Sequence, residues 1–111
     1  MIPVQAIWLA TQPLDMRSGI DSPLARVVAV FGAAQPHHAY VFTNRSHTRL
    51  KVLVHDGIGL WLAARRLHRG RFVCADVQAG SQVPLSHPQL EALVLGLPWQ
   101  RVEPGGAIRL V

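Results

Sequence analysis

Arginine and lysine are the side chains of this sequence whose number and spacing point most directly to chemistry. Residues 40–73 hold seven of the chain's eleven basic residues and a single acid, Asp56. So large a local excess of positive charge is either a strongly solvated surface or a site for an anion. Guanidinium groups bind phosphate in bidentate fashion, so the basic residues are candidates for contact with a nucleic-acid backbone. These candidates are Arg45, Arg49, Lys51, Arg65, Arg66, Arg69 and Arg71.

Residues that could support catalysis are sparse. The six histidines are spread along the chain without an HxxxH or HExxH pair, and the lone Cys74 has no CxxC companion. No serine lies in a GxSxG elbow, and there is no phosphate-binding GxxxxGK[ST] loop. A metal-dependent nuclease would need the carboxylates of Asp15, Asp21 and Asp56 to converge on one site. Because the whole chain has only six acidic residues, this interpretation is less favoured. We therefore expect a protein that is not an enzyme and that has no metal site and no cofactor.

A second set of residues has the types that shape loops. Glycine adopts backbone angles that other residues avoid, and aspartate accepts hydrogen bonds from nearby backbone amides. Asp15 and Asp21 also flank Arg17, which favours a structural bracket over an acid–base pair. The predicted structural residues are Asp15, Arg17, Gly19, Asp56, Gly57, Gly59 and Gly70.

The elements that must position the basic residues are predicted to be strands. Turn-like residues interrupt the segment at 44–48, 56–59 and 68–70, which predicts an antiparallel meander of about four strands ending at Val73. If residues 56–59 form a hairpin turn, Leu53 lies opposite Leu62 and Arg49 lies opposite Arg66. Leucine, alanine and arginine are also strong helix formers, so a helix over residues 60–67 remains the alternative.

The predicted pairing places two like charges opposite each other. Such a pair costs stability unless water or a partner's negative charge compensates it, which favours an anionic partner. Arg49, Lys51 and Arg66 would share one face with Leu53 and Leu62, while Trp61 would lie in the interior on the other face. The other aromatic residues of the segment, Tyr40, Phe42 and Phe72, are better candidates for the core than for stacking on bases.

The flanking sequence predicts one further strand and two helices. Residues 4–10 favour an N-terminal strand, and Ser22 followed by Pro23 favours a helix that Gly32 closes. Residues 76–84 are predicted to be a loop. Ser86 with Gln89 has the spacing of a capping box and opens a second helix, after which Trp99 is expected to pack on the core. The result is an α+β fold in a single domain, residues 1–100, with a flexible tail at residues 101–111.

Composition limits the broad class of protein. The chain has 111 residues, 50% hydrophobic and 15% charged, which is enough for one globular core. Its formal net charge of +5 favours an acidic partner, first nucleic acid and second an anionic membrane surface. No apolar run approaches the roughly 18 residues of a membrane span, and a single cysteine suits a reducing compartment. We expect a soluble cytoplasmic protein without a membrane partner.

An ordered string of short motifs covers the chain up to about Arg101. It comprises MIPV, Asp15-Met16-Arg17 with Gly19, Val41-Phe42 with Asn44-Arg45, Arg49-Leu50-Lys51-Val52-Leu53, His55-Asp56-Gly57 with Gly59, Arg65-Arg66-Leu67 with Gly70-Arg71-Phe72, and LSHPQLEALVLGLPW. In this order the motifs resemble the small accessory proteins of the IS66 family of bacterial insertion sequences. The chain departs from that family's usual pattern at Ser46, Thr48, Cys74 and Ala75.

The resemblance implies a role in transposition beside two other proteins of the same element. These are a transposase, which cuts the DNA, and a second small accessory protein. The resemblance does not imply a catalytic activity. Two hypotheses follow, a protein that binds DNA at the element's ends through its basic strands, or an adaptor that binds the transposase or the second accessory protein. An exposed apolar edge of the meander would also let two copies pair as a homodimer.

Overall fold

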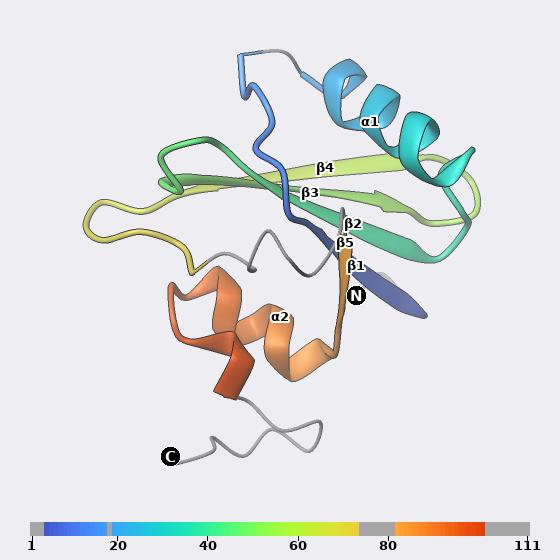
Figure 1. Cartoon of the computed structure of the whole chain (residues 1–111). Helices are drawn as coiled ribbons and strands as arrows, with labels where there is room; N and C mark the ends of the chain where they lie inside the picture. Colours follow the sequence, from blue (N-terminus) through green and yellow to red (C-terminus); the bar gives the residue numbers. More distant parts are fainter. Residues whose placement is uncertain (1–3, 18, 74–81, 102–111) are drawn as a thin grey trace.

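The computed structural model describes residues 4–17, 19–73 and 82–101, which form a mixed five-stranded sheet with a helix on each face (Figure 1). The predicted α+β class, the number of strands and the N-terminal strand are confirmed. The strands are β1 (Ala6–Ala10), β2 (His38–Thr43), β3 (Arg49–His55), β4 (Leu60–Arg66) and β5 (Gln82–Leu85). The helices are α1 (Asp21–Phe31), α2 (His87–Val94) and the short 3-10 helix η2 (Trp99–Arg101).

Strands β2, β3 and β4 form an antiparallel meander with the predicted register. Leu53 lies opposite Leu62, and Arg49 lies opposite Arg66. The alternative of a helix over residues 60–67 is wrong. Pairing with β3 overrides the helix propensity of this segment, because Leu62 packs from β4 against the buried Leu53 and its neighbours.

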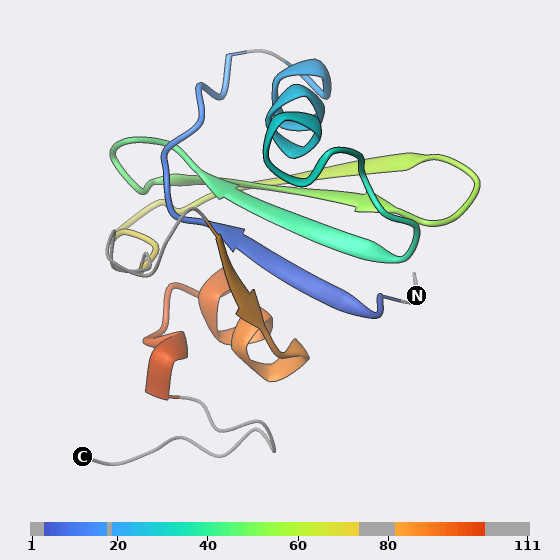
Figure 2. The same cartoon turned by 45° about the vertical axis from the view of Figure 1, so that its right-hand side comes forward.

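The remaining neighbours in the sheet differ from the expected meander. Residues 71–73 form no strand, and β2 instead pairs in parallel with β1, whose other edge carries β5 in antiparallel orientation (Figure 2). The predicted loop at 76–84 is therefore wrong at its end, where Gln82 to Pro84 belong to β5; residues 76–81 lie outside the described residues. Two parallel strands must be joined by a crossover connection, which α1 provides here. Because a crossover contains no short hairpin turn, no local signal in the sequence indicated the pairing of β1 with β2.

The two helices begin differently. In α2 the predicted capping box is present, since Ser86 Oγ accepts from the N–H of Gln89 (3.2 Å) and Gln89 Oε1 accepts from the N–H of Ser86 (2.9 Å). In contrast, α1 begins at Asp21, one residue before the predicted cap Ser22, and the residue at its N-cap is Ile20 without a side-chain cap. Proline is tolerated in the first turn of a helix, so Pro23 is compatible with this earlier start.

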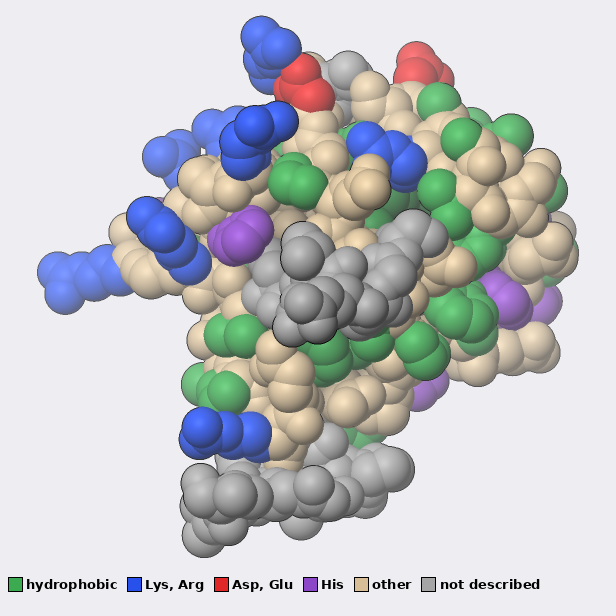
Figure 3. All heavy atoms as spheres, viewed as in Figure 1, with side chains coloured by type: hydrophobic (Ala, Val, Ile, Leu, Met, Phe, Trp, Pro, Cys, Tyr) green, Lys and Arg blue, Asp and Glu red, His purple; other side chains and the backbone are tan. Residues whose placement is uncertain are grey.

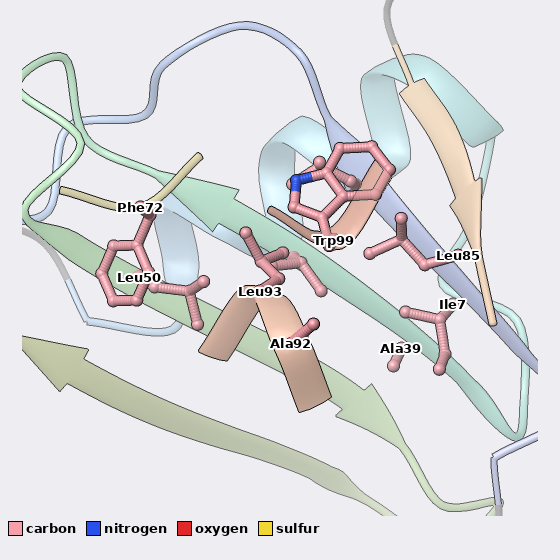
Figure 4. Close-up of a cluster of buried hydrophobic side chains, with 10 residues drawn as sticks. Ile7, Ala39, Leu50, Phe72, Leu85, Ala92, Leu93 and Trp99 are labelled. Atoms are coloured by element: carbon pink, nitrogen blue, oxygen red, sulfur yellow. The ribbon is translucent and has the colours of Figure 1, made fainter. Parts of the chain in front are cut away.

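Buried side chains form one cluster on each face of the sheet. The cluster under α2 contains Leu50, Phe72, Leu93 and Trp99 (Figure 4), and the cluster under α1 contains Leu14, Val27, Tyr40, Phe42 and Leu53. Trp99 is 5% exposed and its Nε1 donates to the carbonyl of Val73 (2.7 Å), so its predicted packing on the core is confirmed.

One aromatic prediction is wrong. Trp61, expected in the interior, is 56% exposed. It lies on β4, the outermost strand of the sheet, where six of the seven residues are exposed. Neither buried cluster includes a residue of β4 other than Leu62. The face of β4 that carries Trp61 therefore lies outside the core, and Trp61 stays exposed.

Two remaining predictions concern the C-terminal tail and membrane-spanning segments. The predicted tail, residues 101–111, lies outside the described residues except for Arg101, which ends η2. Across the described ranges, no helix has the length and apolar character that crossing a bilayer requires.

Candidate nucleic-acid interface

Basic side chains gather at one end of the sheet, where β2 ends, β3 begins and β4 ends (Figure 3). We call this group the basic end. Arg49 and Arg66 are cross-strand neighbours there, and Arg45 lies in the turn that joins β2 to β3. The basic end comprises Arg17, Arg45, Arg49, Lys51, Arg65, Arg66, Arg69 and Arg71.

The turn at residues 44–48 is fixed by its own hydrogen bonds. Asn44 Oδ1 accepts from the backbone N–H groups of Thr48 (2.9 Å) and Arg49 (3.1 Å), and Asn44 Nδ2 donates to Thr48 Oγ1 (3.2 Å). His47 adopts a left-handed φ of 60°. These contacts hold the backbone on both sides of Arg45 while its side chain stays exposed.

The segment after β4 is tied to the same turn. The N–H of Leu67 donates to the carbonyl of Thr48 (3.1 Å), and the N–H of Phe72 donates to the carbonyl of His47 (2.7 Å). The Phe72 ring is buried, and Gly70 takes a φ of 77° that suits glycine. Arg69 and Arg71 are therefore exposed on a loop whose two ends are both anchored.

The loop before α1 brings an eighth cation. The N–H of Leu14 donates to the carbonyl of Thr43 (2.9 Å), which places this loop beside the end of β2. Lys51 Nζ donates to the carbonyl of Met16 (3.0 Å), so this half-buried lysine also secures the loop. Because Arg17 is distant in the sequence from the basic segment, spacing alone gave no signal that it would join the basic end.

Arg17 is paired with the acid beside it. Its Nε lies 3.0 Å from both carboxylate oxygens of Asp15, and its Nη2 lies 2.7 Å from Oδ2. Hydrogen bonds from the Arg17 side chain and backbone lower the pKa of Asp15 to about 2. The bracket that the sequence favoured for Asp15 thus has a geometric basis with Arg17, while Asp21 lies at the start of α1.

Two open grooves run between these loops and strands. One lies between the loop before α1 and the β2–β3 turn and is lined by Arg17, Arg45 and Arg49 among others. The second follows β3 and β4 and is lined by Arg49, Lys51, Arg65 and Arg66 among others. Arg49 borders both grooves, so it lies at the centre of the basic end.

Acids in the described part of the chain do little to neutralise this surface. Asp56 sits in the β3–β4 turn, seven residues after Arg49, which is about 23 Å along an extended strand. Asp21 opens α1 and Glu91 lies on α2. Asp15, the acid at the basic end, already binds Arg17. The candidate anion site therefore keeps a large positive excess in three dimensions.

The Asp56 turn is the other place where predicted structural residues meet. Asp56 Oδ1 accepts from the N–H groups of Gly59 (2.7 Å) and Ile58 (2.8 Å), and Oδ2 accepts from Trp61 Nε1 (2.7 Å). These hydrogen bonds lower the pKa of Asp56 to about 2. Gly57 has a φ of 92°, whereas Gly59 and Gly19 lie outside the left-handed region.

Among the residues that the structure describes, the three carboxylates considered for a nuclease lie apart, and no cluster of metal ligands is present. Asp15 and Asp56 lie at opposite ends of the sheet, so the nuclease triad with Asp21 does not converge. No three His, Cys, Asp or Glu side chains in the described ranges come together as metal ligands.

The fold and the basic end define a small α+β protein with its positive charge concentrated on one surface. A family model described as "IS66 Orf2 like protein" matches residues 5–104. Uncharacterized protein y4hO of Sinorhizobium fredii (strain NBRC 101917 / NGR234) is 38% identical over 95 residues, covering 85% of this chain and 82% of that protein. Uncharacterized protein y4jC of the same strain is 33% identical over 99 residues, covering 87% and 83%. No solved structure matches.

The chain therefore belongs to the IS66 Orf2-like family, and the resemblance in its motifs is confirmed. Membership implies an accessory role in the transposition of an insertion sequence.

Proposed function

We propose that this protein is a non-catalytic accessory factor of transposition that binds duplex DNA near the ends of its element. The observation that carries the proposal is the convergence of eight cations from three loops and two strands, with Asp15 as the acid beside them. We place its action in the bacterial cytoplasm, together with the transposase and the second small accessory protein.

Binding through the phosphate backbone fits the shape of the basic end. Its grooves are open and lined by arginine, which can hold phosphate oxygens in bidentate fashion. The turn at Asn44 and the anchored loop at Phe72 fix the backbone around Arg45, Arg69 and Arg71, so less conformational entropy is lost on binding. Contacts of this kind position a protein on DNA without reading sequence.

The first test is fluorescence anisotropy of the protein with a duplex from the element's terminal repeat and with a scrambled duplex, across a salt series. We expect both duplexes to bind, with affinity that falls steeply as salt rises. A preference for the terminal repeat would add readout of bases or DNA shape. Absence of binding to either duplex at low salt would refute direct DNA contact.

A matched pair of variants separates the basic end from net charge. Arg49→Ala with Arg66→Ala should weaken binding to both duplexes and reduce the slope of log affinity against log salt by about 1.8, because two phosphate contacts are lost. The control is Arg26→Ala with Arg101→Ala, which removes the same charge from α1 and η2. Equal losses in the two variants would mean that the effect is only one of total charge.

A second candidate function is an adaptor that binds the transposase or the other accessory protein. The observation that favours it is the exposed apolar pair at the opposite end of the sheet, Ile58 at 98% and Trp61 at 56% exposure. Aromatic and arginine residues are both common at protein interfaces. Co-purification with either protein after nuclease treatment, lost on Ile58→Ser but kept on Arg49→Ala with Arg66→Ala, would support this function.

A further inference from the structure

Strand β4 presents an edge that has no partner strand among the described residues. It is the outermost strand of the sheet, seven residues long, and pairs with β3 on its inner side. The other outer strand, β5, is four residues long and contains Pro84, which cannot donate a hydrogen bond. Short strands and prolines protect sheet edges from pairing with other chains, and β4 has neither.

The register shows which backbone groups of β4 face outward. The N–H of Leu67 donates to Thr48 and the N–H of Asp56 donates to the carbonyl of Gly59, so the odd-numbered residues from 59 to 67 bond to β3. Hydrogen-bonded and non-hydrogen-bonded residues alternate along an antiparallel strand. Leu60, Leu62, Ala64 and Arg66 therefore direct their backbone N–H and C=O groups away from the sheet.

A second copy of β4 fits this edge in one symmetrical arrangement. If two β4 strands run antiparallel about a two-fold axis at Ala63, all seven residues overlap and the outward groups of Leu62 meet those of the second copy's Ala64. At the axis, Ala63 faces Ala63 in a non-hydrogen-bonded pair, where side chains come closest and small residues fit. Arg65 and Arg66 then lie opposite Trp61 and Leu60 of the second copy, so no two like charges face each other.

The same arrangement gives Arg65 a complementary site. Trp61 is exposed, and its Nε1 is held by the carboxylate of Asp56, whose Oδ2 retains room for another donor. Trp61 and Arg65 are on the same face of β4, so in the symmetrical pair each Arg65 guanidinium reaches the indole and carboxylate of the other copy. A guanidinium over an indole is attracted by the ring, and an aspartate at its edge adds a charge-assisted hydrogen bond.

We propose that this protein forms a homodimer in which the β4 edges of two copies pair antiparallel about Ala63, with each Arg65 on the Trp61–Asp56 site of the other copy. The pairing makes one continuous ten-stranded sheet. An interface of one strand from each copy is at the small end of specific interfaces, so we expect dissociation in the micromolar range. The proposal does not depend on DNA binding, and in the dimer Arg65 contacts the other copy while the other seven cations of the basic end stay available to DNA.

Disulfide trapping tests the register directly. With Cys74 replaced by serine, Ala63→Cys places two thiols at the axis, where the expected Cβ separation suits a disulfide. The control is Leu60→Cys, whose two copies would be six residues apart along the strands, about 20 Å. Mild oxidation should give a covalent dimer with Ala63→Cys and not with Leu60→Cys. Trapping of both or of neither would overturn the register.

Analytical ultracentrifugation across micromolar concentrations tests the edge itself. Ala64→Pro removes an N–H group that points outward and leaves the hydrogen bonds to β3 in place. It should shift the protein from dimer to monomer. Circular dichroism checks that the variant is folded. Ile58→Ser, which removes the most exposed apolar side chain in the same hairpin, should leave the dimer intact. A wild-type protein that is monomeric throughout, or a dimer lost only with Ile58→Ser, would refute the proposal.

Discussion

Asp56 organises the β3–β4 turn through a single carboxylate. One oxygen accepts two backbone N–H groups and the other accepts the indole of Trp61. The sequence predicted the turn and its glycines, because Asp and Gly have known roles in turns. It placed Trp61 in the interior, since alternation assigns a residue to a face and does not show whether anything covers that face.

The lowered pKa of Asp56 makes its effect on stability depend on pH. Its folded value of about 2 lies below the ordinary value of 3.8, so the ionised carboxylate stabilises the folded state above about pH 4 and loses that effect as pH falls through 2. Asp56→Ala should therefore lower the thermal midpoint at pH 7, and its difference from wild type should shrink towards pH 2. Thermal unfolding followed by circular dichroism at several pH values measures this.

Asp56→Asn serves as the control for charge. Its side-chain oxygen can still accept from Ile58 and Gly59, so it should be less damaging than alanine, and its own side chain should contribute no pH dependence. A loss of midpoint in Asp56→Ala that is the same at pH 2 and pH 7 would contradict the role given to the ionised carboxylate.

At the scale of elements, most local signals were reliable, although α1 begins before its predicted cap Ser22 and residues 71–73 form no strand, and long-range signals were not. The register of β3 with β4 and the capping box of α2 follow from residues close in sequence, and both are as predicted. The parallel pairing of β1 with β2 and the position of β5 depend on contacts between distant segments. Nothing in an apolar run of five residues specifies which strand will lie beside it.

The β2–β3 turn joins stability to the proposed function. Asn44→Ala removes the acceptor of the Thr48 and Arg49 N–H groups in a half-buried position, and should lower the free energy of unfolding by about 1–2 kcal/mol. DNA affinity should also fall, because Arg45 and Arg49 lose their fixed backbone. Urea unfolding and anisotropy measure the two effects.

Ser46→Ala is the control in the same turn. It removes an exposed hydrogen bond to Thr48 Oγ1 (2.9 Å) and should change both quantities little. If Asn44→Ala left stability unchanged, the turn would be held by contacts other than those of its side chain.

For the whole molecule, the dominant feature is the separation of charge along the sheet. Seven of the eight cations of the basic end were candidates from sequence, because they cluster there; the eighth, Arg17, needed the tertiary contact of its loop with β2. The residues of the candidate surface were thus largely predictable from the sequence. Their separation from Asp56 was not predictable, because Asp56 lies among the basic residues in the sequence but at the far end of the strands in the structure.

Combining the basic end with the proposed dimer gives a prediction about assembly. An antiparallel β4 pair directs the two basic ends in opposite directions, so one dimer should hold two duplexes at once. Energy transfer between two differently labelled duplexes should appear on adding the wild-type protein. Ala64→Pro should keep binding to one duplex and lose this signal, and a signal retained by a monomeric Ala64→Pro would contradict the arrangement.

The parallel pairing of β1 with β2 also sets the order in which the sheet can be completed during synthesis. β1 leaves the ribosome first, yet one of its edges waits for β2 and the other for β5, more than 70 residues later. The β2–β3–β4 meander depends on local contacts and can form while β5 and α2 are still being made. Until they emerge, β1 keeps an unpaired edge, so the nascent chain is most open to wrong strand pairing at its own N-terminal strand.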